Sequence, residues 1–209
     1  MTKAPLTDKT PDDRGLGFVP PGFKVDVTQI GAKQWELLAK LEYTAAREPF
    51  TVPAGAPTDF ASVPRIFVWF IPTYGKYTKA AILHDDLCGK SEAGQFLRRE
   101  ADGIFRQAMR LEGVAFLRRW VMWTGVRWGA LFAKNGRKEW WKDAWLVLPI
   151  TFLVAFVIVP PAVLIVFALV AWYILELIAW VLQWLASSVR TSQGRPSKQV
   201  NQPELSLKM

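Results

Sequence analysis

The alternation of apolar and polar residues in the first third of the chain is typical of short β-strands. Residues Phe23–Thr28 alternate strictly, which predicts a half-buried strand. The run Trp35–Tyr43 fits one helical face as well as a strand. We favour a strand there because the run lies between two strand-like segments. Pro49–Pro57 carries several prolines, which predicts a short edge strand that ends in a turn.

Three helices are predicted after these strands. The first covers Tyr77–Cys88, with Gly89 as its C-cap. The second covers Phe96–Leu111 and ends before Gly113. The third covers about Val114–Ala133 and is rich in tryptophan and arginine.

The composition changes abruptly at residue 144. From Ala144 to Ala186 the single charged residue is Glu176. One straight helix of this length would measure about 65 Å, roughly twice the hydrocarbon thickness of a bilayer. Because the adjacent Pro160 and Pro161 interrupt helical hydrogen bonding, we predict a membrane helical hairpin that turns at this pair. A re-entrant hairpin that does not cross fully is the alternative.

These patterns predict an α+β fold. A small N-terminal β-hairpin or sheet precedes about three helices, and a C-terminal transmembrane helical hairpin follows. The expected parts are a flexible N-terminus over 1–22, a soluble domain over 23–134, the hairpin over 140–188, and a disordered basic tail over 189–209.

Charge and tryptophan content favour a membrane surface over nucleic acid. The chain has 26 Lys and Arg against 18 Asp and Glu, a formal charge of +8, and 11 Trp. Tryptophan and basic side chains both anchor proteins at lipid headgroups, and no nucleic-acid-binding motif is present. The tryptophans expected at the membrane are Trp120, Trp123 and Trp128 of the third helix, and Trp140, Trp141 and Trp145 before the hairpin.

The residues that flank and interrupt the hairpin predict its orientation and contacts. Basic residues such as Arg137 and Arg190 lie on both sides, so the positive-inside rule places the soluble domain and both termini in the cytoplasm. Glu176, Gln183 and Ser187 form a polar stripe on the second arm, which favours self-association. An intramembrane carboxylate is functional by default, and a plain helix contact or a protonated interfacial residue is the alternative.

The candidate chemistry lies around the single histidine. Asp85 follows His84 directly, and Asp102 lies on the next predicted helix. Antiparallel packing of the two helices would bring Asp102 to one ring nitrogen of His84, leaving the other nitrogen to activate water. Asp59 and Asp85 would supply hard oxygen ligands for Ca²⁺. The lone Cys88 excludes an intramolecular disulfide and a cysteine zinc site.

Each of these four residues also has a purely structural interpretation. His84 fits a core position with a backbone carbonyl as its partner. The carboxylates fit ordinary pairs or turns: Asp102 with Arg99 or Arg106, Asp85 with Lys79, and Asp59 in a turn or helix cap.

Three motifs resemble a phage and prophage family called domain of unknown function 1353. They are F-T-V-P-A-G-A-P-T-D-F-A-S-V-P-R, Y-G-K-Y-T-K-A-A-I-L-H-D and A-D-G-I-F-R-Q-A-M. The resemblance covers about residues 23–130. It implies a viral or prophage origin, and hence the inner membrane of a host, but it assigns no activity.

A second, distant resemblance is to bacterial phospholipase A2. An aspartate in a loop, a helix with His-Asp, and a helix with Asp followed by Phe three residues later are similar to the layout of that family. The resemblance implies that His84 is the water-activating base and Asp102 its orienting partner. It implies that Asp59 and Asp85 bind calcium, although no glycine-rich calcium loop adjoins Asp59.

Two classes of function follow. The first is a membrane-anchored hydrolase of phage origin that acts on membrane lipids or esters with the assistance of calcium. The alternative is a non-catalytic phage membrane protein in lysis, envelope modification or superinfection exclusion, whose hairpin is the active part. A virion component is a third option, which the membrane hairpin disfavours.

Overall fold

The computed structural model describes most of the chain. The described residues are 15–32, 34–46, 48–61, 63 and 67–192. The predictions of a flexible segment over residues 1–14 and a disordered tail over 193–209 lie outside them.

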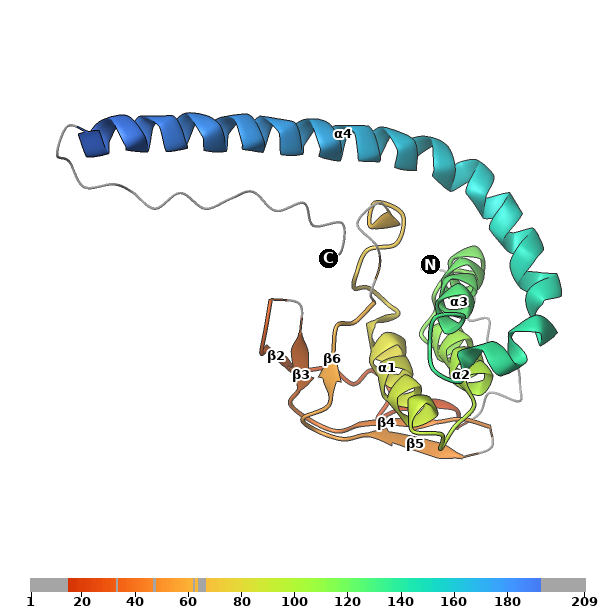
Figure 1. Cartoon of the computed structure of the whole chain (residues 1–209). Coiled ribbons are helices and arrows are strands. Elements are labelled where there is room, and N and C mark those ends of the chain that lie inside the picture. Colours follow the sequence, from red (N-terminus) through yellow and green to blue (C-terminus); the bar gives the residue numbers. More distant parts are fainter. Residues whose placement is uncertain (1–14, 33, 47, 62, 64–66, 193–209) are drawn as a thin grey trace, which may run out of the picture. The chain divides into compact units, whose positions relative to one another are not determined.

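The chain divides into two compact units. The first comprises Met1–Ser62 and Pro72–Ala155, and the second comprises Val63–Ile71 and Phe156–Met209. The strands, three helices and the beginning of a fourth helix belong to the first unit (Figure 1).

The first unit contains two three-stranded antiparallel sheets. One has the order β1-β4-β5 and the other the order β2-β3-β6. The strands are β1 (Gly17–Val19), β2 (Val27–Gln29), β3 (Trp35–Leu37), β4 (Leu41–Thr44), β5 (Pro49–Val52) and β6 (Pro57–Thr58). The predicted edge strand at Pro49 is confirmed, since β5 lies at the end of its sheet.

Two sequence predictions about the N-terminal part of the chain are wrong. The run Trp35–Tyr43 is not one strand, because the chain bends at Leu38 and Ala39 and enters the other sheet as β4. The segment 1–22 is not flexible throughout, because β1 pairs with β4 and buries Phe18 against Tyr43, with ring centroids 5.0 Å apart. Aromatic cross-strand pairs of this kind stabilise a sheet.

Three helices follow the strands, as predicted. They are α1 (Thr78–Glu92), α2 (Arg98–Leu111) and α3 (Phe116–Ala130). α1 contacts β5 and α2, and α2 contacts β1 and α3, so α1 and α2 lie against the β1-β4-β5 sheet and α3 packs on α2. The predicted cap at Gly89 is wrong: α1 continues to Glu92, and Gly94 just beyond it has the positive φ of 78° that suits a helix end.

A short 3-10 helix, η3 (Gly136–Lys142), packs back onto α3. Asn135 before it has a φ of 65°, in the left-handed region. A Cβ at Gly136 would lie 2.0 Å from the carbonyl oxygen of Ala130, so glycine is required for this close approach. The turn therefore brings the tryptophans of η3 against those of α3.

Most of the tryptophans predicted to lie at the membrane instead form a cluster inside the first unit. Trp123 and Trp140 are buried beside Val147, and Trp120 and Trp128 are partly buried against them. The expectation that Trp123 and Trp140 face lipid is wrong, because both are buried and the Trp140 indole donates to the Arg127 carbonyl at 2.7 Å; for the partly buried Trp120 and Trp128 it stays a prediction.

The two remaining tryptophans are exposed. Trp141 is 77% exposed and Trp145 is 70% exposed. They therefore remain available to a membrane interface, where indole rings concentrate.

The predicted hairpin is wrong, because the apolar segment is a single helix, α4 (Ala144–Ser192). Pro160 and Pro161 lie within it. They cannot donate to the carbonyls of Phe156 and Val157, but the φ of proline is itself helical, so the lost hydrogen bonds do not end the helix. By length and composition, Ala144–Ser188 is able to cross a membrane.

The first turns of α4 belong to the folded core of the first unit. Val147 is fully buried in the tryptophan cluster. The Trp128 indole donates to Thr151 at 2.8 Å, and the Thr151 hydroxyl donates to the Val147 carbonyl at 2.7 Å. The first unit therefore extends past the predicted boundary at residue 134, to Ala155.

Beyond Ala155, α4 presents apolar side chains to its surroundings. Phe156 is 84% exposed, and Leu164 and Phe167 are each 70% exposed. The Glu176 carboxylate accepts a 2.7 Å hydrogen bond from the Trp172 indole of the same helix. This local contact satisfies part of the polar stripe, and self-association stays a prediction.

Replacing Trp140 with Phe should destabilise the protein by about 1 to 3 kcal/mol, because the Arg127 carbonyl loses a buried donor and a cavity forms. Trp141→Phe is the matched control and should stay within about 0.5 kcal/mol of wild type. Chemical unfolding of the detergent-solubilised chain measures both values. Equal stability of the two variants would contradict the cluster described above.

A chain that ends at Ala155 should unfold cooperatively, whereas a chain that ends at Lys134 should not. The shorter chain lacks Trp140 and Val147, and its core is therefore incomplete. Circular dichroism during denaturant titration in detergent distinguishes the two. Cooperative unfolding of the shorter chain would show that the core does not need η3 and α4.

Candidate functional site

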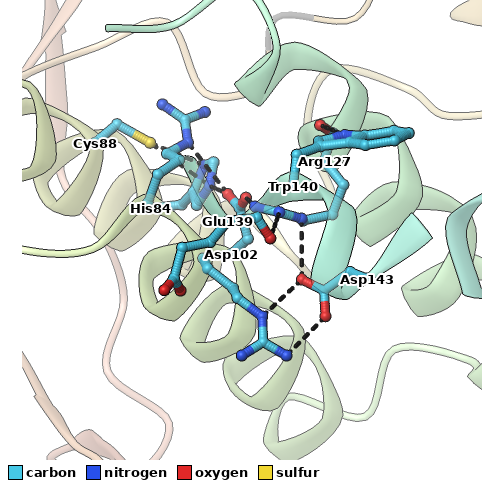
Figure 2. Close-up of polar contacts among 9 residues, drawn as sticks. His84, Cys88, Asp102, Arg127, Glu139, Trp140 and Asp143 are labelled. Atoms are coloured by element: carbon cyan, nitrogen blue, oxygen red, sulfur yellow. Dashed lines mark hydrogen bonds and ion pairs between the residues drawn. The ribbon is translucent and has the colours of Figure 1, made fainter. Parts of the chain in front are cut away.

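His84 and Asp102 are in direct contact. The Nε2 atom of His84 on α1 lies 2.8 Å from Oδ1 of Asp102 on α2 (Figure 2). Both residues are buried. The His84 ring also lies 4.7 Å from the Phe105 ring, centroid to centroid. The carboxylate and the aromatic ring together hold the imidazole in one orientation, as the predicted helix packing requires.

Two guanidinium groups also bind Asp102. Nη1 of Arg127 on α3 lies 2.9 Å from Oδ2, and Nε of Arg98 lies 3.3 Å from Oδ1. His84 and Arg98 therefore share one carboxylate oxygen, and Arg127 binds the other. A carboxylate with no exposed surface needs such partners, because an unpaired buried charge costs several kcal/mol.

The contacts continue from Arg127 to the start of α4 (Figure 2). Nε of Arg127 lies 3.3 Å from Oδ2 of Asp143, and Arg99 binds the same carboxylate through Nε at 2.9 Å and Nη2 at 2.8 Å. The Asp143 carbonyl accepts from the amide of Val147 at 3.0 Å. We call the residues Arg98, Asp102, Arg127, Asp143 and Arg99 the charge ladder.

The ordinary pairs expected from helical spacing are mostly wrong. Asp102 pairs with neither Arg99 nor Arg106, since the Arg106 guanidinium stacks over Trp120 at 4.1 Å from the ring centroid. Lys79 pairs with Glu112 at 2.6 Å rather than with Asp85. Lys79 thus takes a partner from another helix, whereas Asp102 keeps one from its own helix, Arg98.

The second nitrogen of His84 faces a thiol. Sγ of Cys88 lies 3.6 Å from Nδ1 and 3.5 Å from Nε2. Burial raises the pKa of Cys88 to about 12, so the thiol stays protonated at neutral pH and is no nucleophile. A thiol is a weak hydrogen-bonding partner, so Cys88 binds the imidazole less strongly than Asp102 does.

The loop before α1 binds Asp85. The Thr58 hydroxyl donates to Oδ2 of Asp85 at 2.6 Å and accepts from the Phe60 amide at 3.0 Å. The Asp59 backbone also hydrogen-bonds the Asp85 carboxyl. These contacts hold Phe60 in the left-handed region, with a φ of 62°, which costs a residue with a side chain about 1 kcal/mol.

The Asp85 carboxyl is held mostly in its neutral form at neutral pH. Burial, with a smaller contribution from the nearby Asp59 charge, raises the pKa of Asp85 from 3.8 to about 8. The Thr58 hydroxyl and the Arg98 guanidinium oppose this shift. Asp59 thus lies near Asp85, which directly follows His84 in the chain.

The donor set does not fit calcium. Among the described residues there is no group of three or more His, Cys, Asp or Glu side chains that could hold a metal ion. Calcium takes six to eight oxygen ligands, and Oδ2 of Asp85 already accepts from Thr58. Calcium therefore enters no chemical step below, and its binding by Asp59 and Asp85 stays a prediction.

Residues 35–126 match a family model described as "Protein of unknown function (DUF1353)". The match supports the family resemblance for this segment, which contains both His84 and Asp102. Neither the curated proteins nor the solved structures contain a significant match. Arg127 and Asp143 lie beyond the matched residues, so two of the five residues of the charge ladder are outside the family model.

Sequence reasoning missed the arginines that bind Asp102. Arg98 precedes Asp102 by four residues, a spacing that places both on one helix face, so its contact could have been predicted. Arg127 lies on another helix, and no local signal in the sequence relates it to Asp102.

Replacing Asp85 with Asn should flatten the dependence of stability on pH. Because the folded pKa of about 8 exceeds the unfolded value, the contribution of Asp85 to wild-type stability is fully present below about pH 4 and is lost as pH rises through about 8. The slope from this group is at most about 1.4 kcal/mol per pH unit. Unfolding free energies at several values between pH 5 and 8 measure it. Parallel curves for wild type and variant would rule out the raised pKa.

Proposed function

We propose that this protein is a hydrolase that cleaves ester bonds of membrane lipids, with His84 as the base that activates water. The observation that carries the proposal is the 2.8 Å contact between Nε2 of His84 and Oδ1 of Asp102. A proton on Nε2 is donated to the carboxylate, and Nδ1 then carries the lone pair. This is the tautomer that a water-activating histidine needs.

His84 and Asp102 together account for every proton transfer of the proposed reaction. Nδ1 takes a proton from water while the water oxygen attacks the ester carbonyl. Asp102 stabilises the imidazolium that forms, and His84 then gives the proton to the departing alkoxide. The order of the loop aspartate, the His-Asp helix and the Asp-x-x-Phe helix supports the phospholipase A2 comparison, and Phe105 packs against the His84 ring.

The membrane part of the proposal rests on α4 and its start. The helix is long and apolar enough to cross a bilayer, and its large side chains are exposed. Trp141 and Trp145 are exposed at its beginning, beside the exposed Lys142. The phage or prophage origin and the inner membrane of the host belong to the same proposal and rest on the family resemblance.

The orientation is proposed for the first unit alone. The basic residues before α4, such as Arg137 and Lys142, favour the cytoplasmic side for it. The prediction that both termini are cytoplasmic depended on a hairpin, and a single crossing would separate them.

A non-catalytic membrane protein is the second candidate. The observation that favours it is the burial of the pair: His84 is 6% exposed and Asp102 is fully buried between two guanidinium groups. In that case the pair joins the helices, and α4 is the agent in lysis, envelope modification or superinfection exclusion.

Substitutions at the pair decide between the two candidates. His84→Asn and Asp102→Asn should each lower fatty-acid release from mixed phospholipid micelles by about 10² to 10⁴. Asp86→Asn is the matched control, since that carboxylate pairs with Lys90 at 2.7 Å, and it should retain activity. Circular dichroism checks the fold of each variant. Equal release by wild type and His84→Asn would refute the hydrolase.

A further inference from the structure

Arg98 lies beside the proposed base. Its Nε atom is 3.3 Å from Oδ1 of Asp102, the same oxygen that contacts Nε2 of His84 at 2.8 Å. The guanidinium and the imidazole are therefore neighbours on one carboxylate oxygen. The positive charge of Arg98 also lowers the pKa values of Asp85 and Cys88 against the larger effect of burial. Arg98 is thus close to every polar group around His84.

The two arginines that bind Asp102 differ in burial and in how many of their nitrogens have a polar partner. Arg127 is fully buried, and its three nitrogens approach Asp102, Asp143 and the Glu139 carbonyl. The Arg98 side chain is 12% exposed, and in the described part of the chain its one polar partner is Asp102, through Nε. The N–H groups on both Nη atoms of Arg98 therefore remain available to a ligand.

The charges around this side chain do not balance. The charge ladder has three guanidinium groups, of Arg98, Arg99 and Arg127, against the two carboxylates of Asp102 and Asp143. Burial keeps the nearby Asp85 carboxyl mostly neutral at pH 7. Arg98 and Arg127 share the carboxylate of Asp102, and of these two guanidinium groups only Arg98 has exposed surface, so an anion can reach Arg98 from solvent.

We propose that Arg98 is an anion-binding residue, which takes the phosphate group of a phospholipid through its Nη atoms. Arginine matches phosphate geometry in a bidentate contact, whereas lysine supplies only a point charge. The inference rests on the proposed function, because it assigns the headgroup contact of the same site. Phosphate bound at Arg98 would hold the lipid beside His84, where the ester carbonyl is to be attacked.

The single histidine makes this contact measurable without any turnover. In the full chain, labelled at histidine and held in a neutral maltoside detergent, the ring signals in NMR spectra report on His84 alone. The probes are inorganic phosphate, dihexanoyl phosphatidylglycerol and, as the uncharged comparison, dihexanoylglycerol. Both phosphate probes should shift the ring signals to saturation, and dihexanoylglycerol should not. The two phosphate arms separate a free phosphate site from a headgroup site that binds the lipid more tightly.

Arg98→Gln should weaken binding of both phosphate probes at least tenfold, and Arg98→Lys should weaken it less. Arg118→Gln, at an exposed position of α3, removes one positive charge elsewhere and should bind as wild type does. Arg98→Lys keeps the charge beside Asp102 and stays informative if the glutamine variant fails to fold.

Unchanged binding by Arg98→Gln, or an equal response to dihexanoylglycerol, would overturn the anion site. Phosphate binding that depends on Arg98, in a protein without lipid hydrolysis, would refute the hydrolase and leave the anion site intact. Hydrolysis with the same KM in wild type and Arg98→Gln would refute the anion site alone.

Discussion

The buried carboxylate of Asp102 is the constraint on which the rest of the first unit depends. A charge with no exposed surface has to be neutralised by groups from neighbouring elements. His84 comes from α1, Arg98 from the start of α2, and Arg127 from α3. Because Arg127 also binds Asp143, the same requirement fixes the beginning of α4. Four helices thus share one electrostatic centre, and the sheet beneath supplies the apolar support.

In the proposed hydrolase, this centre has two uses that compete for the same carboxylate. An orienting aspartate stabilises imidazolium best when its negative charge is not spent on other cations, whereas a buried aspartate is most stable when cations surround it. Arg127 has no exposed surface and stabilises the buried charge of Asp102. Arg98, being slightly exposed, is placed where a substrate anion could draw its charge away from Asp102. Ligand binding would then strengthen the influence of the carboxylate on His84.

The predictable parts of this protein were those with local signals. The left-handed Gly113 marked the end of α2, and the spacing of apolar residues in α1 and α2 brought Asp102 to His84. The predictions failed where distant partners decide. Trp123 looks interfacial in sequence, but it is buried beside Trp140 of η3. The paired prolines predicted a turn because proline removes helical hydrogen bonds. The φ of proline is itself helical, however, and α4 continues through both residues.

The burial of Val147 has a consequence for the timing of synthesis. The core of the first unit cannot close until Trp140 and Val147 have left the ribosome. After Val147, the ribosome needs about 2 to 8 s to synthesise the rest of the apolar segment as far as Ser188, at 5–20 residues per second. The first unit is therefore complete for only a few seconds before the exposed apolar part of α4 leaves the ribosome. Folding of the first unit and the appearance of α4 therefore occur almost at the same time during synthesis.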